Sequence, residues 1–202
     1  MTLTELIAQG EGLRLEFKSK LPAAPKIART LAAFANTSGG TLLVGVADNG
    51  SLVGVESEFD EMEKIERVTE SLIHPPLDVS YRAHRQQGKT VLWLTITESQ
   101  QKPHTVPNDR GGRTIYVRQR DKSVPTNHFN HPSQPLDPQL LKTPPVKQLL
   151  AFLQKNDSLT ADRCATLVNV SAYRAGKLLR ELAAQGVLLL VDSPRPARYS
   201  LK

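Results

Sequence analysis

The segment Phe34–Gly54, FANTSGGTLLVGVADNGSLVG, constrains the fold more than any other part of the chain. It begins as a helix end, and Gly39 and Gly40 permit the sharp backbone reversal that leads from a helix into a strand. Thr41–Val46 is a short apolar run with β-branched residues, which predicts a strand buried on both faces. The Asp-Asn-Gly sequence that starts at Asp48 separates two apolar runs and predicts a hairpin turn. We therefore expect a helix, a tight turn, a central strand that ends near Asp48, and a second short strand.

The residues around this segment predict the other elements of an α+β domain. Glu11–Lys18 alternates apolar and charged side chains after Gly12, which is typical of a half-buried strand. Lys26–Thr37 has its apolar residues on one helical stripe, and the acidic stretch Glu56–Glu70 also has helical spacing. Further strands are predicted at Leu77–Arg85, Thr90–Thr97 and Thr114–Arg118. The expected fold is a mixed-sheet α+β domain over residues 1–125.

A proline-rich stretch follows this domain. Six prolines lie between Val124 and Pro145, a density that disfavours a long helix and predicts a partly extended, semi-rigid linker over residues 126–145. His128 and His131 are interpreted as polar groups of the linker, because no carboxylate or cysteine stands at a metal-ligand spacing from them.

The net charge of the chain is concentrated behind this linker. Residues 140–202 contain ten basic and four acidic side chains, whereas residues 1–139 contain sixteen of each, so the C-terminal third carries the whole net charge of +6. A basic face of this kind indicates a polyanionic partner, and the alternative is an ordinary solvated surface.

The pattern of residues 146–202 predicts a winged helix-turn-helix domain. Three helical segments, the second and third capped by Thr160 and Ser171, precede two strands separated by a basic loop. In such a domain the exposed side of the third helix recognises DNA, and the loop forms the wing. The side chains expected to contact nucleic acid are Tyr173, Arg174, Lys177 and Arg180 on this helix and Arg195 in the wing. The alternative is a winged helix used for protein contacts.

A second basic region lies in the predicted α+β domain. It contains Lys102, Arg110, Arg113, Arg118, Arg120 and Lys122, opposed only by Asp109 and Asp121. Arg118 and Arg120 are therefore also predicted to contact nucleic acid.

Residues 5–125 resemble a known family. The pattern Glu11-x4-Glu16-Phe17-Lys18, followed by Ala33-Phe34-Ala35-Asn36-Thr37-x-Gly39-Gly40-Thr41-Leu42-Leu43-x-Gly45-Val46-x-Asp48-x-Gly50-x3-Gly54, is similar to the Schlafen-type Alba-like domain. Lys102-Pro103-His104 and Tyr116-Val117-Arg118 resemble the later strands of that family. One departure is Arg120, which stands where the family tends to have glycine, so the loop there is expected to have a different shape.

The resemblance implies three different functions. Bacterial members joined to a helix-turn-helix resemble transcriptional regulators. Members with nuclease activity use two glutamates and an aspartate, which correspond here to Glu11, Glu16 and Asp48, to cut RNA with Mg²⁺ or Mn²⁺. The alternative for these carboxylates is structural: Glu16 pairs with Lys18 or Lys26, Glu11 caps a turn, and Asp48 holds its own hairpin. An ATPase label also exists in the family, but ATP binding is disfavoured because the chain has no Gly-x4-Gly-Lys-Ser/Thr loop.

The sequence thus favours a nucleic-acid-binding protein over an enzyme, with DNA favoured over RNA and with no cofactor required for binding. A transcriptional regulator acting as a C2 homodimer, which would pair two recognition helices, is the expected function. The alternative is a divalent-metal-dependent endoribonuclease. No apolar run reaches the roughly 20 residues of a membrane span, the N-terminus does not resemble a secretory leader, and a single cysteine, Cys164, fits a reducing, cytoplasmic setting.

Overall fold

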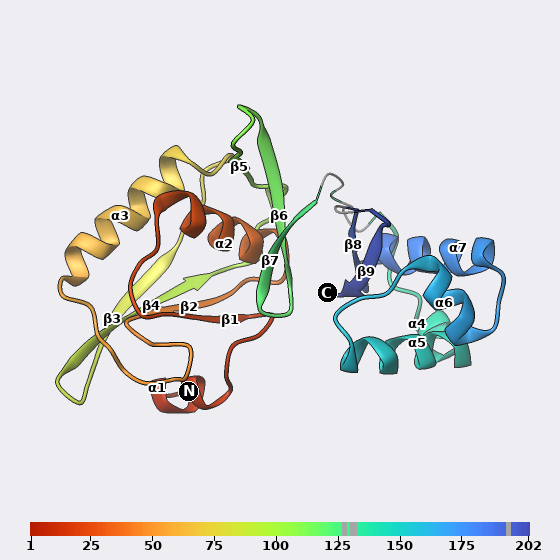
Figure 1. Ribbon diagram of the computed structural model, residues 1–202, viewed down its shortest axis with the longest axis horizontal. Coiled ribbons are helices and arrows are strands. Elements are labelled where there is room, and N and C mark those ends of the chain that lie inside the picture. The colour runs from red at the N-terminus through yellow and green to blue at the C-terminus, as the bar shows by residue number, and fades with distance from the viewer. Residues whose placement is uncertain (127–128, 130–132, 193–194) are drawn as a thin grey trace. The chain divides into compact units, whose positions relative to one another are not determined.

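The computed structural model describes residues 1–126, 129, 133–192 and 195–202. The chain forms two compact units, Met1–Val124 and Pro125–Lys202, whose elements are labelled in Figure 1. His128 and His131 lie outside the described residues. In the described part of the chain, every helix is too short or too polar to span a bilayer.

A four-stranded mixed sheet forms the centre of the first unit. Its strands have the order β1-β2-β4-β3 and comprise Leu15–Lys18 (β1), Gly40–Val44 (β2), Ser80–Gln86 (β3) and Lys89–Ile96 (β4). β1 runs parallel to β2, whereas the β2–β4 and β4–β3 pairs are antiparallel. This arrangement confirms the predicted α+β class with a mixed sheet.

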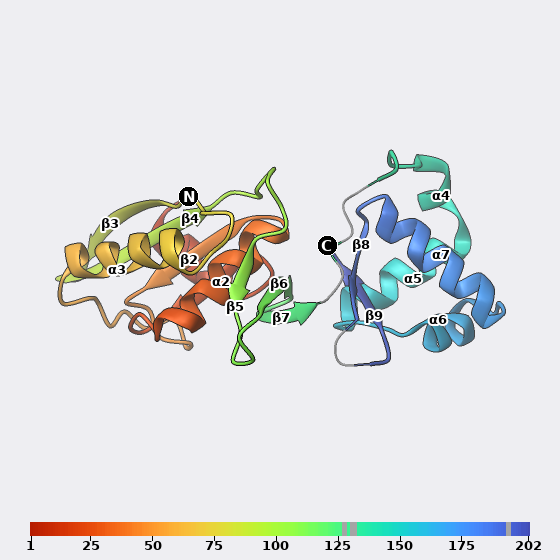
Figure 2. The same cartoon turned by 90° about the horizontal axis from the view of Figure 1, so that it is seen from above.

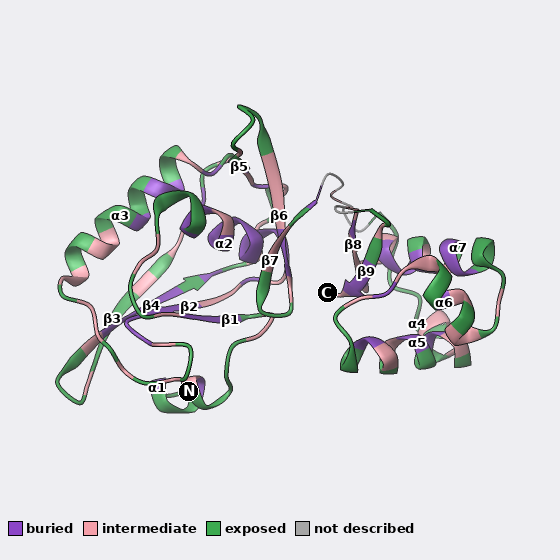
Figure 3. Cartoon of the chain, viewed as in Figure 1, coloured by how far each residue is buried: buried purple, intermediate pink, exposed green. Residues whose placement is uncertain are grey.

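Helices cover both faces of this sheet. The alternation of side chains along β2 and β4 sends Leu42 and Leu92 to one face, where they join a core formed with α2 (Ala24–Asn36) and α3 (Glu58–Ser71). The opposite face packs its side chains, including Trp93, against the short helix α1 (Leu3–Ala8). The views from the side and from above show α2 and α3 over the same sheet (Figures 1 and 2). The buried residues in Figure 3 accordingly follow the central strands and the inner side of α2.

A second sheet of the first unit has the order β5-β6-β7 and comprises Thr105–Pro107 (β5), Arg113–Gln119 (β6) and Lys122–Thr126 (β7). It is held to the end of α2 by the buried side chain of Asn36. The Asn36 amide donates to the carbonyl oxygens of His104 and Tyr116 at 2.8 and 2.9 Å, and its Oδ1 accepts from the His104 N–H at 2.7 Å.

The turn between α2 and β2 is as the sequence predicts, and its glycines have a steric reason. Gly39 has a φ of +68°, and a Cβ there would lie 2.7 Å from the Ile96 carbonyl oxygen. A Cβ at Gly40 would lie 2.4 Å from the Phe34 ring. The second short strand expected after Asp48 is reduced to a single bridge between Val46 and Leu52. The regular ladder is interrupted at Gly45, which has a φ of +98° and whose carbonyl oxygen accepts from the N–H groups of both Val53 and Gly54.

The second unit contains four helices and a hairpin among its described residues. Its elements are α4 (Pro138–Lys142), α5 (Pro144–Lys155), α6 (Ala161–Val168), α7 (Ala172–Ala184), β8 (Leu188–Val191) and β9 (Arg198–Leu201). β8 and β9 are antiparallel. Leu149, Cys164 and Leu179 contribute to a buried core shared by the helices and the hairpin, and burial raises the pKa of the Cys164 thiol.

Local signals explain where these helices begin. The hydroxyls of Thr160 and Ser171 accept from the N–H groups of Arg163 and Arg174, which confirms both predicted N-caps. The stretch 126–145 is less extended than predicted, since α4 and the start of α5 lie inside it. Each of these helices has a proline in its first turn, where no N–H is needed and where the fixed φ of proline suits the helix.

Candidate nucleic-acid interface

The outer face of α7 carries the aromatic and basic side chains predicted to contact nucleic acid. Tyr173 is 77% exposed, and Arg174, Lys177 and Arg180 are also exposed. The opposite face of α7 is buried in the core through side chains such as Leu179 and Leu182. The helix is therefore amphipathic, and its polar face contains aromatic and cationic groups in successive turns.

These cations form no ion pair with the carboxylates that the structure describes. Over the described residues, no carboxylate lies within ion-pair distance of Arg174, Lys177 or Arg180. Arg174 and Lys177 are thus available to phosphates. Arg180 differs, because its guanidinium lies 3.3 Å from the position that a Cβ on Gly176 would occupy, so its side chain runs back along α7. Its charge also lies near Tyr199, whose pKa is raised by burial and lowered to a smaller extent by Arg180.

Arg195 is exposed in the loop between β8 and β9. This is the loop position that the sequence predicts for it. Arg198, at the start of β9, is exposed as well.

The basic region of the first unit is more heterogeneous than its sequence suggests. Arg110, Arg113, Arg120 and Lys122 are exposed. Arg113 donates from Nη2 to the Leu72 carbonyl at the end of α3, at 2.8 Å. Lys102 is partly buried and pairs with Glu98. Four of the six cations are therefore exposed, and one of these, Arg113, is held by a backbone carbonyl.

Arg118 does not belong to any accessible surface, which corrects its assignment as a nucleic-acid contact. Its side chain is completely buried, and its guanidinium lies over the Phe34 ring at 4.5 Å. It donates to Glu16 Oε2 at 2.5 Å, to the Gly12 carbonyl at 2.9 Å and to Ser123 Oγ at 3.1 Å. Desolvation lowers the pKa of Arg118, and the Glu16 carboxylate opposes this effect. A buried guanidinium of this kind joins β6 to β1 and cannot reach a phosphate.

Arg120, two residues later, has a φ of +54° in the turn between β6 and β7. This is the left-handed conformation that glycine adopts without strain. The backbone at this position therefore has the conformation that a glycine would adopt, although the residue is arginine. The arginine thus does not require the different loop shape that the sequence predicts.

The three carboxylates of the predicted metal site do not converge. Both oxygens of Glu16 are occupied, Oε2 by Arg118 and Oε1 by the Lys18 ammonium at 2.8 Å. Glu11 Oε1 accepts from the Phe17 N–H at 2.7 Å. The Glu11 carboxylate therefore lies beside Phe17 in β1, whereas Asp48 lies in the turn that follows β2.

A divalent cation needs several oxygen ligands around one point. Across the described ranges, no group of three His, Cys, Asp or Glu side chains is placed to hold a metal ion. The residues therefore do not fit the Mg²⁺ or Mn²⁺ site that the ribonuclease alternative requires. The structural alternative for Glu16 is correct in one respect, its pairing with Lys18, but it omitted Arg118, which is the closer and more buried partner.

Comparison with solved structures finds similar folds at low identity. The DIP2311 protein from Corynebacterium diphtheriae has 19% identity and a TM-score of 0.45, with 81% of this chain and 39% of that chain covered. The N-terminal domain of a RecG-related protein from Nitrosomonas europaea has 23% identity and a TM-score of 0.44, with 65% of this chain and 99% of that chain covered. The chain thus spans well under half of the Corynebacterium protein. No match was found among curated proteins.

A comparison with protein families identifies the family of the first unit. Residues 11–127, more than half of the chain, match the family described as Schlafen, AlbA_2. This range begins at Glu11, includes the α2–β2 turn and both residues of the Glu16–Arg118 pair, and ends after β7. The chain therefore belongs to the Schlafen AlbA_2 family.

Proposed function

We propose that this protein binds DNA through its second unit and acts as a transcriptional regulator. The observation that carries the proposal is the outer face of α7, where Tyr173, Arg174 and Lys177 are exposed and the two cations have no carboxylate partner among the described residues. Membership of the Schlafen AlbA_2 family supports a nucleic-acid partner.

In this proposal the second unit is a winged helix-turn-helix. α6 and α7 are joined by a three-residue turn in which Asn169 adopts the left-handed conformation, and the β8–β9 hairpin follows α7. α7 is then the recognition helix. Tyr173 and Arg174 in its first turn contact base edges, Lys177 contacts phosphate, and Arg195 reaches the backbone from the hairpin loop.

Duplex DNA is the preferred partner because an α-helix fits the B-form major groove, whereas the major groove of A-form RNA is too deep and narrow for it. Arg110, Arg120 and Lys122 on the first unit supply further positive charge for backbone contacts. The protein acts as a C2 homodimer, which would place two copies of α7 on symmetric half-sites. Analytical ultracentrifugation should then give twice the chain mass of 22.3 kDa.

The proposal is tested by the salt dependence of DNA binding. A fluorescein-labelled 30-base-pair duplex of mixed sequence is titrated with the full chain and with the Arg174→Ala/Lys177→Ala variant at several salt concentrations. Because Lys177 contacts phosphate and Arg174 contacts a base edge, the magnitude of the slope of log K against log salt should fall by about 0.9, the contribution of one phosphate contact. Affinity at low salt should fall by at least tenfold.

The matched control removes two charges from another exposed surface of the same unit. Lys147 and Lys155 are exposed on α5, and Lys147→Ala/Lys155→Ala should leave the salt slope within about 0.5 of the unaltered chain. Equal losses in the two variants would mean that only net charge matters and would reject α7 as the recognition helix. Tighter binding to an RNA hairpin of equal length would reject the choice of DNA.

A further inference from the structure

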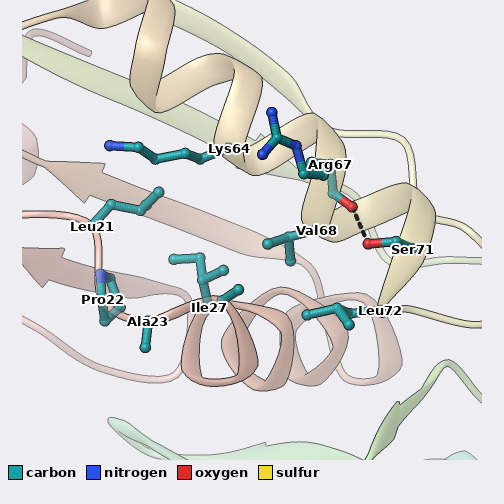
Figure 4. A pocket seen from close by; sticks show the side chains of 10 residues that line it. Leu21, Pro22, Ala23, Ile27, Lys64, Arg67, Val68, Ser71 and Leu72 are labelled. Atoms are coloured by element: carbon teal, nitrogen blue, oxygen red, sulfur yellow. Dashed lines mark hydrogen bonds between the residues drawn. The ribbon is translucent and has the colours of Figure 1, made fainter.

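A pocket of about 540 Å³ lies in the first unit between the start of α2 and the second half of α3. Its floor and walls are mainly apolar, with Leu21, Ile27, Val68 and Leu72 facing the space. Figure 4 shows the long side chains of Lys64 and Arg67 extending from α3 on the other side of the same space. The volume is within the range of roughly 300–1,000 Å³ that is usual for small-molecule sites.

The acidic and basic side chains of α3 are distributed unevenly around this pocket. α3 contains six acidic side chains and only two basic ones, Lys64 and Arg67. Both basic side chains line the pocket, and none of the acidic side chains does so among the described residues. A neighbouring pocket on α3 has the opposite character, since it is lined by Glu66, Glu70 and Asp78 without a cation in the described part of the chain. The two basic groups of an otherwise acidic helix therefore both lie at the first pocket.

One of the two cations can change partners at little cost. Arg67 pairs with Glu63 at 2.8 Å, and the two side chains are 71% and 69% exposed. An exposed ion pair of this type adds little to stability, so an anionic ligand in the pocket can compete for Arg67. Lys64 is 57% exposed and pairs at 3.1 Å with Glu61, which is only 17% exposed, so Lys64 contributes its charge at the pocket while it remains beside Glu61.

The start of α2 adds a weaker positive contribution. Its N-cap is Ala23, which has no side-chain capping bond, and the first turn of this 13-residue helix contains no acidic residue. Pro25 has no N–H, and the Lys26 N–H bonds to the Ala23 carbonyl, so the helix acts mainly through its dipole and not through several free donors. Ala23 and Ala24 both line the pocket, which places this positive helix end at its border.

We propose that this pocket binds a small organic anion that has an apolar body and a single carboxylate or sulfonate group. The apolar body rests on Leu21, Ile27, Val68 and Leu72, and the anionic group lies between Lys64 and Arg67. This assignment concerns the first unit alone and does not depend on DNA binding by the second.

The test uses two aromatic probes that differ in charge, 1-anilinonaphthalene-8-sulfonate and its uncharged analogue N-phenyl-1-naphthylamine. Each is titrated into the full chain by fluorescence, and the sulfonate is also followed by amide NMR. We expect one sulfonate per chain, with the shifted amides concentrated at 21–27 and 64–72. Lys64→Gln/Arg67→Gln should weaken sulfonate binding about tenfold, since two exposed charge contacts are lost, and should change binding of the uncharged probe less than twofold.

The control variant is Arg14→Gln/Arg85→Gln, which removes two exposed cations of the same unit that do not line the pocket. It should bind the sulfonate as the unaltered chain does. Equal weakening in both double variants would overturn the proposal, as would NMR shifts centred elsewhere. A parallel loss of the uncharged probe in Lys64→Gln/Arg67→Gln would show that the substitutions damaged the pocket itself, and this too would overturn the assigned role of the two charges.

Discussion

Breaking the buried pair between Glu16 and Arg118 should strongly destabilise the first unit. Arg118 is completely buried and the Glu16 side chain is 9% exposed, with 2.5 Å between Nη1 and Oε2. Removing one partner of a buried ion pair leaves an uncompensated charge and typically costs 3–5 kcal/mol. Glu16→Gln keeps the shape of the side chain and removes its charge, so we expect a loss of about 3 kcal/mol. For a unit of this length that corresponds to roughly a 10–15 °C lower Tm.

The two single substitutions should differ in how much they lower the free energy of unfolding. Arg118→Met leaves Glu16 with its second partner, Lys18 at 2.8 Å, so its cost should be smaller than that of Glu16→Gln. In Glu16→Leu/Arg118→Met neither charge remains, and apolar replacement of a buried pair is often close to neutral. The double variant should therefore recover at least about 2 kcal/mol relative to the sum of the Glu16→Leu and Arg118→Met single variants.

The assay is urea unfolding followed by tryptophan fluorescence. Trp93 is the single tryptophan of the chain and is 5% exposed in β4, so its signal reports on the first unit. The exposed Arg67–Glu63 pair is a matched control, and Glu63→Gln should cost less than about 1 kcal/mol. If Glu16→Gln also costs less than 1 kcal/mol, or if the effects at the two positions are additive within 0.5 kcal/mol, the buried pair does not stabilise the unit as argued.

Two further predictions use the same fluorescence assay. Gly39→Ala should destabilise the first unit by about 3 kcal/mol or more, because its Cβ would lie 2.7 Å from the Ile96 carbonyl oxygen. The control is Gly10→Ala, which has a similar φ of +72° but open space around the Cβ position and should cost only about 1 kcal/mol. Equal costs of the two substitutions would refute the steric argument. Burial lowers the pKa of His104, so the imidazole binds a proton more readily in the unfolded chain than in the folded one. The free energy of unfolding should therefore fall as the pH drops below about 6.5, by at most about 1.4 kcal/mol per pH unit. This fall should end once the pH is below the pKa of His104 in the folded state. His104→Gln should reduce this pH dependence, and an unchanged slope between pH 7 and 5 would show that His104 is not responsible.

Local patterns predicted the parts of the fold that depend on local physics. The helix, the tight turn and the strand around Gly39 follow from glycine conformation and a short apolar run. The caps at Thr160 and Ser171 follow from the fit of a hydroxyl to free N–H groups at a helix start. The amphipathic spacing of α7 likewise indicated which of its side chains are exposed.

The role of Arg118 could not be predicted from such patterns. In the sequence it is one of several cations near a turn, and only the packing of β6 against α2 brings it to Glu16, 102 positions away. The same limitation applies to Lys64 and Arg67, which belong to an amphipathic acidic helix in the sequence and line a pocket only when α2 packs beside α3. In the proline-rich stretch the sequence disfavours a long helix, and α4 has only five residues. The short helices there begin at Pro138 and Pro144, in first-turn positions that favour proline, and the number of prolines alone does not predict where such helices begin.

The contacts of Asn36 make this position sensitive to a change of a single atom. Two N–H bonds of its amide point at the carbonyl oxygens of His104 and Tyr116, and its own oxygen receives the N–H of His104. An aspartate has the same outline but would direct oxygen against those two carbonyl oxygens, so shape alone does not satisfy the site. Because one amide group binds both the residue that precedes β5 and a residue of β6, a rotation of the end of α2 would break these hydrogen bonds unless both strands moved with it.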